Sequence, residues 1–341
     1  MKIIAIIMTS FVLTPLLLCA QPLIDPAAPG KSVGGSHLLR LKPVVGQVFH
    51  YRVSTKSQVS AKNSDELLNI ADLKPNDKAL FTAGYYVTVT VRRIREDGAS
   101  DFQIRLDSTY SSLDDNGSRQ SFTSSRAEDA RNPVFEEKAI YTGKDLGVIV
   151  DTVGNFKEIY GFYNIVDNLV EHLPDSLQTG ERIDSISDVV LANTRKILHH
   201  LFCYLPRDPV IKDASSNSTT NEQYAVWSTL EFPMQKDYKE LVFGFEERNA
   251  MTYAIFNSET QMTPVERVLD EPEYHTTLPN YAFSNKDVYY VDRNTGMLAY
   301  DKWTEDQSYT LKIESKLPEK SGKNFATVQR SKVETVVELL R

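Results

Sequence analysis

The stretch Tyr85–Arg93, written YYVTVTVRR, places an apolar side chain at every second position. Tyr85, Val87, Val89 and Val91 form the apolar row. An alternation of period two is typical of a β-strand with one buried face. The pair Asp97-Gly98 follows, which is a strong signal for a hairpin turn. This stretch therefore predicts an antiparallel hairpin and sets the fold class for the chain around it.

The same alternation recurs on both sides of this hairpin, at 47–55 before it and at 241–255, 288–303 and 309–313 after it. Turn sequences separate these segments, including Asp114–Gly117 and Arg293–Gly296. Strands that follow one another through short turns pair antiparallel. We therefore expect a meander of antiparallel strands over most of the chain.

The middle of the chain changes to a helical period. Apolar residues at helical spacing predict one helix over 162–173, ended by Pro174, and a second over Ile183–Leu205. The second helix carries an apolar stripe that includes Val189, Val190 and Leu201. The mixed pattern of Val328–Leu340 fits either a strand or a short helix. Two helices between two groups of strands predict an α+β, β-rich fold: a curved antiparallel sheet or partial barrel with two central helices.

The N-terminus predicts export. Residues 1–20 combine Lys2, a short apolar run and Ala20, which is the pattern of a secretory signal peptide. We favour cleavage after Ala20 over lipidation of Cys19, because Leu18 is a large residue where a lipobox has a small one. Residues 21–36 are rich in Pro, Gly, Ala and Ser and are expected to form a flexible spacer.

The remaining residues, 37–341, are expected to form a single β-rich body. The polar run Ser215–Asn221 marks a loop and the best internal boundary, with halves at 37–214 and 222–341. The predicted location is the periplasm or the extracellular space, as an unanchored protein in preference to an outer-membrane lipoprotein.

Composition excludes several classes of protein. The chain has 341 residues, 41% of them hydrophobic, and a formal net charge of -8. This acidic balance argues against a general nucleic-acid binder. With only two cysteines, no disulfide framework holds the fold.

The sequence assigns no catalytic, cofactor-binding or metal-binding residue. It has no nucleophile elbow, P-loop, dinucleotide fingerprint or HExxH pair. His199 and Cys203 lie four residues apart on the predicted helix, but their apolar neighbours favour an inert, packed thiol. Adjacent carboxylates occur at 136–137, 246–247 and 270–271 and are expected on solvated surfaces. We therefore consider the protein more consistent with a non-enzyme, and we name no ligand-binding residue.

The chain shows two resemblances to known families. The first is to an uncharacterised family of secreted Bacteroidetes proteins with a domain of unknown function, and it rests on Leu39–Pro43, Gly46–Val48, Tyr51–Lys56 and Gly147–Gly154. Val291–Leu298 is similar to a hairpin of Lol-type lipoprotein carriers. That second resemblance implies a curved antiparallel sheet whose helices line an apolar cavity for acyl chains.

Together these observations predict an exported, non-enzymatic protein of the cell envelope. It is expected to bind a lipid-like or apolar ligand in a concave sheet, without a cofactor. Two alternatives stay open at this point. One is a structural or protein-interaction module of the envelope with a filled core, and the other is an unrecognised glycan hydrolase.

Overall fold

The structure is a computed structural model of the whole chain, and it describes residues 22–28, 30–64, 76–130, 132, 135, 139–171, 173–174, 176, 178–227, 230–316 and 324–340. The predicted signal peptide, residues 1–20, lies outside these ranges. Most described residues belong to one 14-stranded sheet, in which eleven strands follow the order β1-β11-β12-β14-β15-β16-β3-β4-β5-β7-β8. The other three strands pair at its margins: β10 with β11, β13 with β14, and β6 with β5. Its strands pair antiparallel throughout, as the hairpin signals predict.

The first half of the chain supplies one side of the sheet and the helices. Its elements are β1 (Lys31–Val33), β2 (Ser36–His37), β3 (Val48–Asn63), β4 (Asn76–Ile94), β5 (Ser100–Asp115), β6 (Ser118–Thr123), α2 (Ala127–Ala130), β7 (Asp145–Val150), β8 (Phe156–Tyr160), α4 (Tyr163–Glu171) and α5 (Gly180–Leu201). The second half supplies β9 (Val210–Ile211), β10 (Ser215–Trp227), β11 (Leu230–Arg248), β12 (Met251–Pro264), β13 (Val268–Asp270), β14 (Tyr274–Asp292), β15 (Leu298–Ser315) and β16 (Asn324–Leu340).

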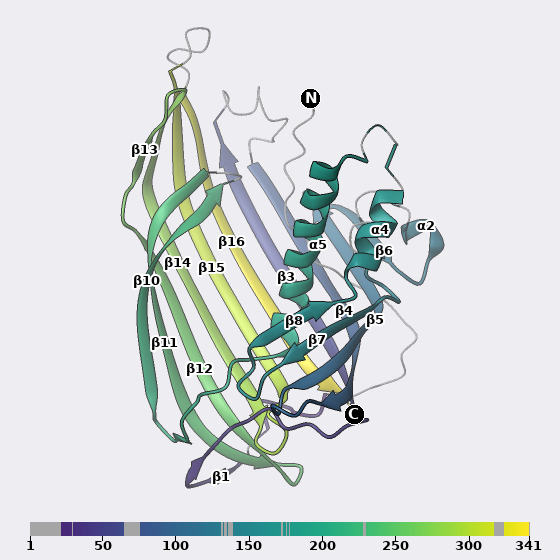
Figure 1. Cartoon of the computed structure of the whole chain (residues 1–341). Helices are drawn as coiled ribbons and strands as arrows, with labels where there is room; N and C mark the ends of the chain where they lie inside the picture. Colours follow the sequence, from purple (N-terminus) through teal and green to yellow (C-terminus); the bar gives the residue numbers. More distant parts are fainter. Residues whose placement is uncertain are drawn as a thin grey trace.

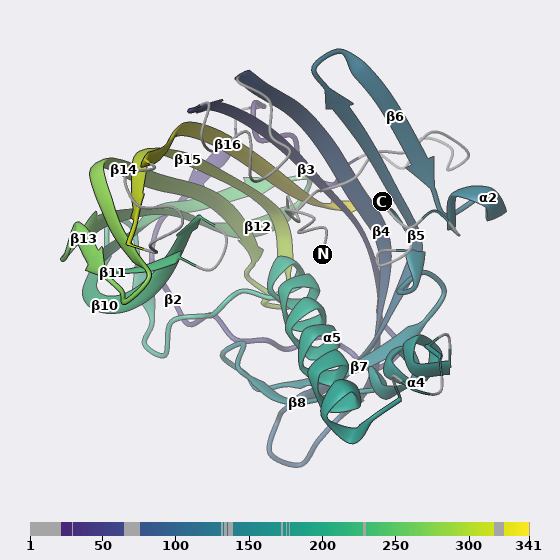
Figure 2. The same ribbon diagram turned by 90° about the horizontal axis from the view of Figure 1, so that it is seen from above.

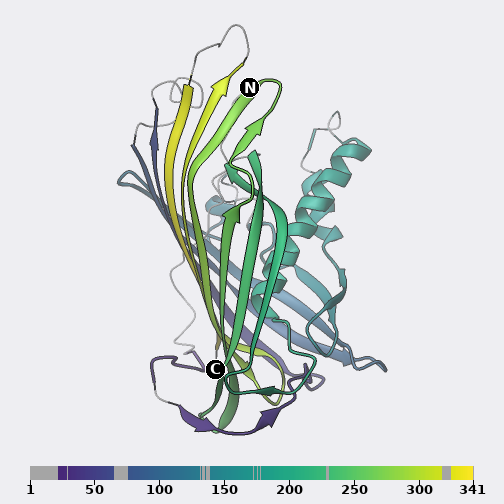
Figure 3. The ribbon, with the colours of Figure 1, turned by 90° about the vertical axis from the view of Figure 1, so that its left-hand side faces the viewer.

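The sheet is long and strongly curved, and α5 lies on its concave side (Figures 1 and 2). Strands of 17 to 19 residues, such as β16 and β4, extend roughly 55–65 Å at about 3.3 Å per residue. The 22 residues of α5 extend only about 33 Å. The helix therefore covers about half the length of the strands, and Figure 3 shows the sheet extending beyond it.

The apolar core lies where α5 meets the sheet. One stripe of α5 is buried, formed by Val190, Thr194, Leu198 and Leu201. It belongs to a large cluster that includes Tyr51, Phe102 and Phe256, each at most 1% exposed. The sequence places Val189 on this stripe, and that prediction is wrong: Val189 is 53% exposed. Neighbouring helical residues point about 100° apart, so only one member of the Val189-Val190 pair can face the core fully.

The predicted hairpins at Asp114–Gly117 and Arg293–Gly296 are present. Asn116 and Gly117 have φ angles of 50° and 90°, which two-residue turns between strands require. At the second hairpin the φ of Gly296 is 71°, and a Cβ there would come within 2.3 Å of the carbonyl oxygen of Arg40. Glycine is therefore needed at this turn for both conformation and space.

Two segments predicted as loops or spacers belong to the sheet instead. In the expected spacer 21–36, Leu23 N donates to Leu339 O at 2.7 Å, Ile24 is 2% exposed, and β1 pairs with β11. The predicted boundary at Ser215–Asn221 forms most of β10. Polar and small residues suit both segments because their strands lie at the sheet margin, where side chains meet water.

Two further differences concern the ends of elements. α5 ends at Leu201, four residues before the predicted end, because Phe202 adopts an extended backbone with φ -129° and ψ 131°. Val328–Leu340, left open between strand and helix, lies in β16 between β15 and β3. A strand in that position is buried on one face and explains Val337 at 0% exposure.

Candidate functional site

The strands present one face to α5, and the register of the sheet identifies which residues lie on it. On β14 and β15 this concave face carries Tyr289 and Val291 beside the helix and Tyr309 and Leu311 at the far end. Residues two positions apart along a strand share a face. Asn285, Asp287, Asp301, Trp303 and Glu305 therefore lie on the concave face between these two ends.

Two apolar clusters bound this stretch. The first is the main core under α5. The second lies at the far end of the strands and is formed by Val226, Phe232, Met234, Leu278, Tyr309 and Leu311. Members of this second cluster are at most 5% exposed. Apart from Thr260, which is buried, the polar residues between them are only partly buried, so this part of the concave face is partly accessible to solvent.

We call the residues between the two clusters the polar band. Its members are Tyr238 and Glu240 on β11, Ser258 and Thr260 on β12, Asn285 and Asp287 on β14, and Asp301, Trp303 and Glu305 on β15. Cross-strand register places them side by side, with Glu240 opposite Ser258, Ser258 opposite Asp287, and Asp287 opposite Trp303. The band therefore crosses four adjacent strands at one level.

A hydrogen-bonded group anchors one end of the band. The Tyr238 hydroxyl donates to Glu240 Oε2 at 2.8 Å, and the Tyr289 hydroxyl donates to the same oxygen at 2.6 Å. Burial and the nearby Glu240 carboxylate raise the pKa of both phenols, so both stay protonated and remain donors at neutral pH. Two donors on one oxygen fix the Glu240 side chain.

Asp287 and Asp301 form a close pair of carboxyls in the centre of the band. Burial raises the pKa of each, and each lies within hydrogen-bonding reach of the other. Their Oδ1 atoms are shut off from solvent and have no hydrogen-bond partner within the described ranges. Two ionised carboxylates cannot bond to each other, whereas a protonated carboxyl donates to an ionised one. Burial and the contact between the two carboxyls therefore favour a proton shared by the pair, which is bound at a higher pH than by an ordinary aspartate.

Burial also raises the pKa of Glu305, further along β15. No Lys or Arg in the described part of the chain forms an ion pair with Glu240, Asp287, Asp301 or Glu305. The opposite, convex face of the same strands carries ion pairs such as Lys302–Glu334 at 2.8 Å and Lys286–Glu259 at 3.5 Å. Carboxylates on the convex face thus have lysine partners, whereas Asp287, Asp301 and Glu305 on the concave face have none in the described ranges and have a raised pKa.

The adjacent carboxylates noted in the sequence do not form this pair. Glu246 binds Arg248 at 2.6 Å, and Asp270 binds Lys316 at 2.6 Å. Residues 136–137 lie outside the described ranges. Asp287 and Asp301 are far apart in sequence and meet because the predicted hairpin at Arg293–Gly296 pairs β14 with β15. The signal available in the sequence was a carboxylate at an inward position on each side of that turn.

The spacing of the Asp287–Asp301 pair bears on the hydrolase alternative. The two carboxyls of a glycosidase lie about 5–10 Å apart, to leave room for a sugar or a water molecule. A pair within hydrogen-bonding reach leaves no such room. This pair therefore does not have the geometry that glycoside hydrolysis requires.

His199 and Cys203 do not form a nucleophilic pair on one helix face, since α5 ends before Cys203. Burial, with Asp301, Asp287 and Glu240 nearby, raises the pKa of the Cys203 thiol to about 12. A thiol with so high a pKa is a poor nucleophile. The neighbouring His200 accepts from or donates to the Tyr85 hydroxyl at 2.6 Å. Burial and the nearby His199 lower the pKa of His200 to about 4, so its ring is neutral at pH 7.

Next to the polar band, the concave face carries several small side chains. On β3 and β16 they include Thr55, Ser57, Ala61, Ser331 and Thr335. Thr55 and Thr335 share a hydrogen bond of 2.9 Å between their hydroxyls. Such small side chains occupy less space on the concave side than the aromatic residues beside α5. The polar band and this floor together form the candidate binding surface.

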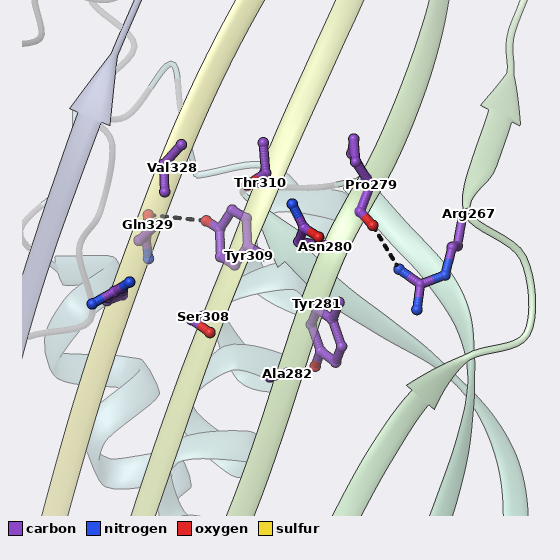
Figure 4. Close-up of a pocket in the computed structure, with 11 residues that line it drawn as sticks. Arg267, Pro279, Asn280, Tyr281, Ala282, Ser308, Tyr309, Thr310, Val328 and Gln329 are labelled. Atoms are coloured by element: carbon purple, nitrogen blue, oxygen red, sulfur yellow. Dashed lines mark hydrogen bonds between the residues drawn. The ribbon is translucent and has the colours of Figure 1, made fainter.

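A separate, shallow depression of about 470 Å³ lies at the far end of the strands (Figure 4). Arg267 borders it and donates from Nη1 to the carbonyl oxygens of Leu278 and Pro279. The Tyr309 hydroxyl donates to Gln329 Oε1 at 2.9 Å. These bonds link neighbouring segments at this end of the strands, and we assign the depression no role.

In the described part of the chain no helix is long and apolar enough to cross a membrane. The same residues contain no group of three or more His, Cys, Asp or Glu side chains arranged to hold a metal ion.

No protein-family model matches the chain, and no curated protein sequence does either. Among solved structures, the chain is similar to one described as "lipid-protein interactions in lipovitellin", with 11% identity and a TM-score of 0.42. That match covers 87% of this chain and 26% of the lipovitellin chain, so the chain spans about a quarter of its length. It also matches OpdL of Pseudomonas aeruginosa, with 8% identity, a TM-score of 0.20, and coverage of 86% of this chain and 99% of that one. The Bacteroidetes and Lol resemblances stay predictions from sequence.

Proposed function

We propose that this chain is an exported, non-enzymatic protein of the cell envelope that holds an elongated, lipid-like ligand on the concave face of its sheet. The observation that carries the proposal is the arrangement of that face. A polar band lies between two apolar clusters, and the band and the floor beside it stay partly exposed. Ligand sites are concave and mostly apolar, with a few placed polar groups.

The chemistry of the band supports an amphipathic ligand over a strongly charged one. Shared protonation of Asp287 and Asp301 lowers the charge that a bound apolar chain would have to meet. Trp303 offers an aromatic surface beside them, and the hydroxyls of Tyr238 and Ser258 offer polar contacts. An apolar chain along the face would meet the clusters at both ends, while a polar group would meet the band.

The test uses Trp303 as a reporter. The chain has two tryptophans, so Trp227→Phe leaves only Trp303. Titrating that variant with a dibrominated stearic acid should quench its fluorescence in a saturable way, because bromine quenches an indole only at close range. The unbrominated acid should compete with the quencher and restore the signal.

Two matched variants locate the binding. Ser331→Phe adds a ring on the concave floor and should abolish the quenching. Ser60 on the neighbouring strand β3 pairs with Arg330, which lies on the opposite face to Ser331. Ser60→Phe therefore makes the same change on the convex face and should leave the quenching unchanged. Absence of saturable quenching, or equal loss in both variants, would count against the proposal, as would lipid extraction from the native envelope that yields no co-purifying apolar compound.

A further inference from the structure

The two edges of the sheet differ in a way that the proposed ligand site does not explain. One edge consists of the short strands β8 and β6, with five and six residues. These strands carry charges at Lys157, Glu158 and Arg119. Short length and charged side chains are features by which proteins prevent edge strands from pairing with other chains.

The strand β10 forms part of the other edge, and over residues 215–221, about half of its length, it has none of these features. β10 has 13 residues, and residues 215–221 (SSNSTTN) contain no charge and no proline. Its register with β11 is regular from Ser215 to Ala225, and the single shift lies between Ala225 and Trp227. A long, regular and uncharged edge strand is a template for a further strand.

This edge is also accessible. Each of the residues 215–221 is exposed. β10 pairs with β11 on one side, and no strand in the described ranges pairs with its other side. The chemistry that fits the outward backbone groups of such an edge is the backbone of another extended segment.

We propose that β10 pairs antiparallel with β10 of a second copy of this chain, about a two-fold axis at Ser218. In this register Ser215 lies opposite Asn221, Ser216 opposite Thr220, and Asn217 opposite Thr219. The first charged residue outward, Glu222, lies opposite Ala214. No like charges face each other, and opposed Ser and Thr hydroxyls can bond across the strands. A chain with a net charge of -8 thus has an uncharged strip at which two copies can meet.

The interface is small, because it involves one strand of each copy. Interfaces below about 1,200 Å² in total are typical of weak or transient complexes. The association is therefore a monomer–dimer equilibrium that depends on protein concentration. It does not depend on whether a ligand occupies the concave face.

A charge introduced at the two-fold axis tests both the identity of the partner and the register of the strands. Ser218 lies opposite its own copy, so Ser218→Lys places two lysines face to face and Ser218→Glu places two glutamates face to face. In sedimentation equilibrium each variant should raise the dissociation constant about fivefold. An equimolar mixture of the two should recover association as a heterodimer. Ser118→Lys adds the same charge on the opposite edge strand and should leave the dissociation constant unchanged.

Three results would overturn the proposal. The first is a wild-type chain that stays monomeric up to about 1 mM, where even a very weak dimer forms. The second is equal behaviour of Ser218→Lys and Ser118→Lys. The third is failure of the mixture to associate more tightly than either variant alone. Circular dichroism of each variant checks that the fold is kept, so that lost association is not lost structure.

Discussion

The same strands make a filled core over one half of their length and a partly open surface over the other. In the main core, the concave face carries Tyr51 and Phe102, both fully buried in one cluster with Leu198 of α5. Outside this core, the concave face carries Trp303, Asp287 and Ser331, which keep partial exposure. The alternation of inward and outward residues does not change between the two halves. What changes is whether the main core packs against the face. The inward residues are large and apolar where it does, and small or polar where it does not.

The largest expected effect is loss of packing under the helix. Leu198→Ala removes a fully buried side chain from α5 and should lower the free energy of unfolding by about 3 kcal/mol, through lost burial and a cavity. Val333→Ala, on the half-buried floor, should cost about 1 kcal/mol or less, because less apolar surface is lost. Urea unfolding followed by circular dichroism measures both. Equal losses would show that the open half is as tightly packed as the covered half.

The second effect is a pH dependence that comes from the covered half. The pKa of His200 falls from 6.5 to about 4 on folding because of burial. The unfolded chain therefore binds more protons between pH 6.5 and 4, and stability falls as pH drops through that window. The full shift corresponds to about 3 kcal/mol. His200→Gln should flatten this slope in urea titrations between pH 7 and 4, and an unchanged slope would contradict the burial of this ring.

The third effect has the opposite sign and comes from the polar band. Burial raises the pKa of Asp287 and Asp301, so the folded chain binds more protons than the unfolded chain above the ordinary aspartate pKa. Their contribution is complete at low pH and is lost as pH rises through the raised pKa values.

Asp301→Asn tests this contribution, because the amide donates to Asp287 without needing a proton. The variant should gain stability relative to the parent as pH rises from 4 to 8, and the gain should be smaller than the His200 effect. Asp306→Asn, an exposed carboxylate on the convex face of the same strand, serves as the control and should show no such trend. If Asp301→Asn left the free energy of unfolding unchanged at every pH, that result would contradict a proton shared by Asp287 and Asp301.

Local patterns predicted the covered half well and the open half poorly. Period-two rows and turn signals identify β4, β5 and the hairpin at Arg293–Gly296, because one face of each strand is uniformly apolar there. The polar band interrupts that uniformity, and inward carboxylates such as Asp287 read as surface residues. Their environment depends on pairing across β11, β12, β14 and β15, which no local pattern contains.

The sheet margins were mispredicted for a related reason. β10 looks like a loop because its residues 215–221 are polar, and β1 lies in a segment whose Pro and Gly content suggests a spacer. A strand with both faces exposed needs no apolar row, so the alternation that identifies other strands is missing. Pairing with β11 supplies the hydrogen bonds that order these segments.

The smallest expected effect comes from a pair of adjacent valines in α5 that the sequence does not distinguish and the structure does. Val189 and Val190 are equally apolar in sequence, yet Val189 is 53% exposed and Val190 is 2% exposed. Val189→Gln should change the free energy of unfolding by no more than about 0.5 kcal/mol, as expected of an exposed position, and glutamine is the better helix former. Val190→Gln buries an amide without a partner and should cost about 2 kcal/mol or more. Urea titrations of the two variants compare them directly. If Val189→Gln were the more damaging, α5 would be rotated about its axis, and the boundary between covered and open halves would have to be redrawn.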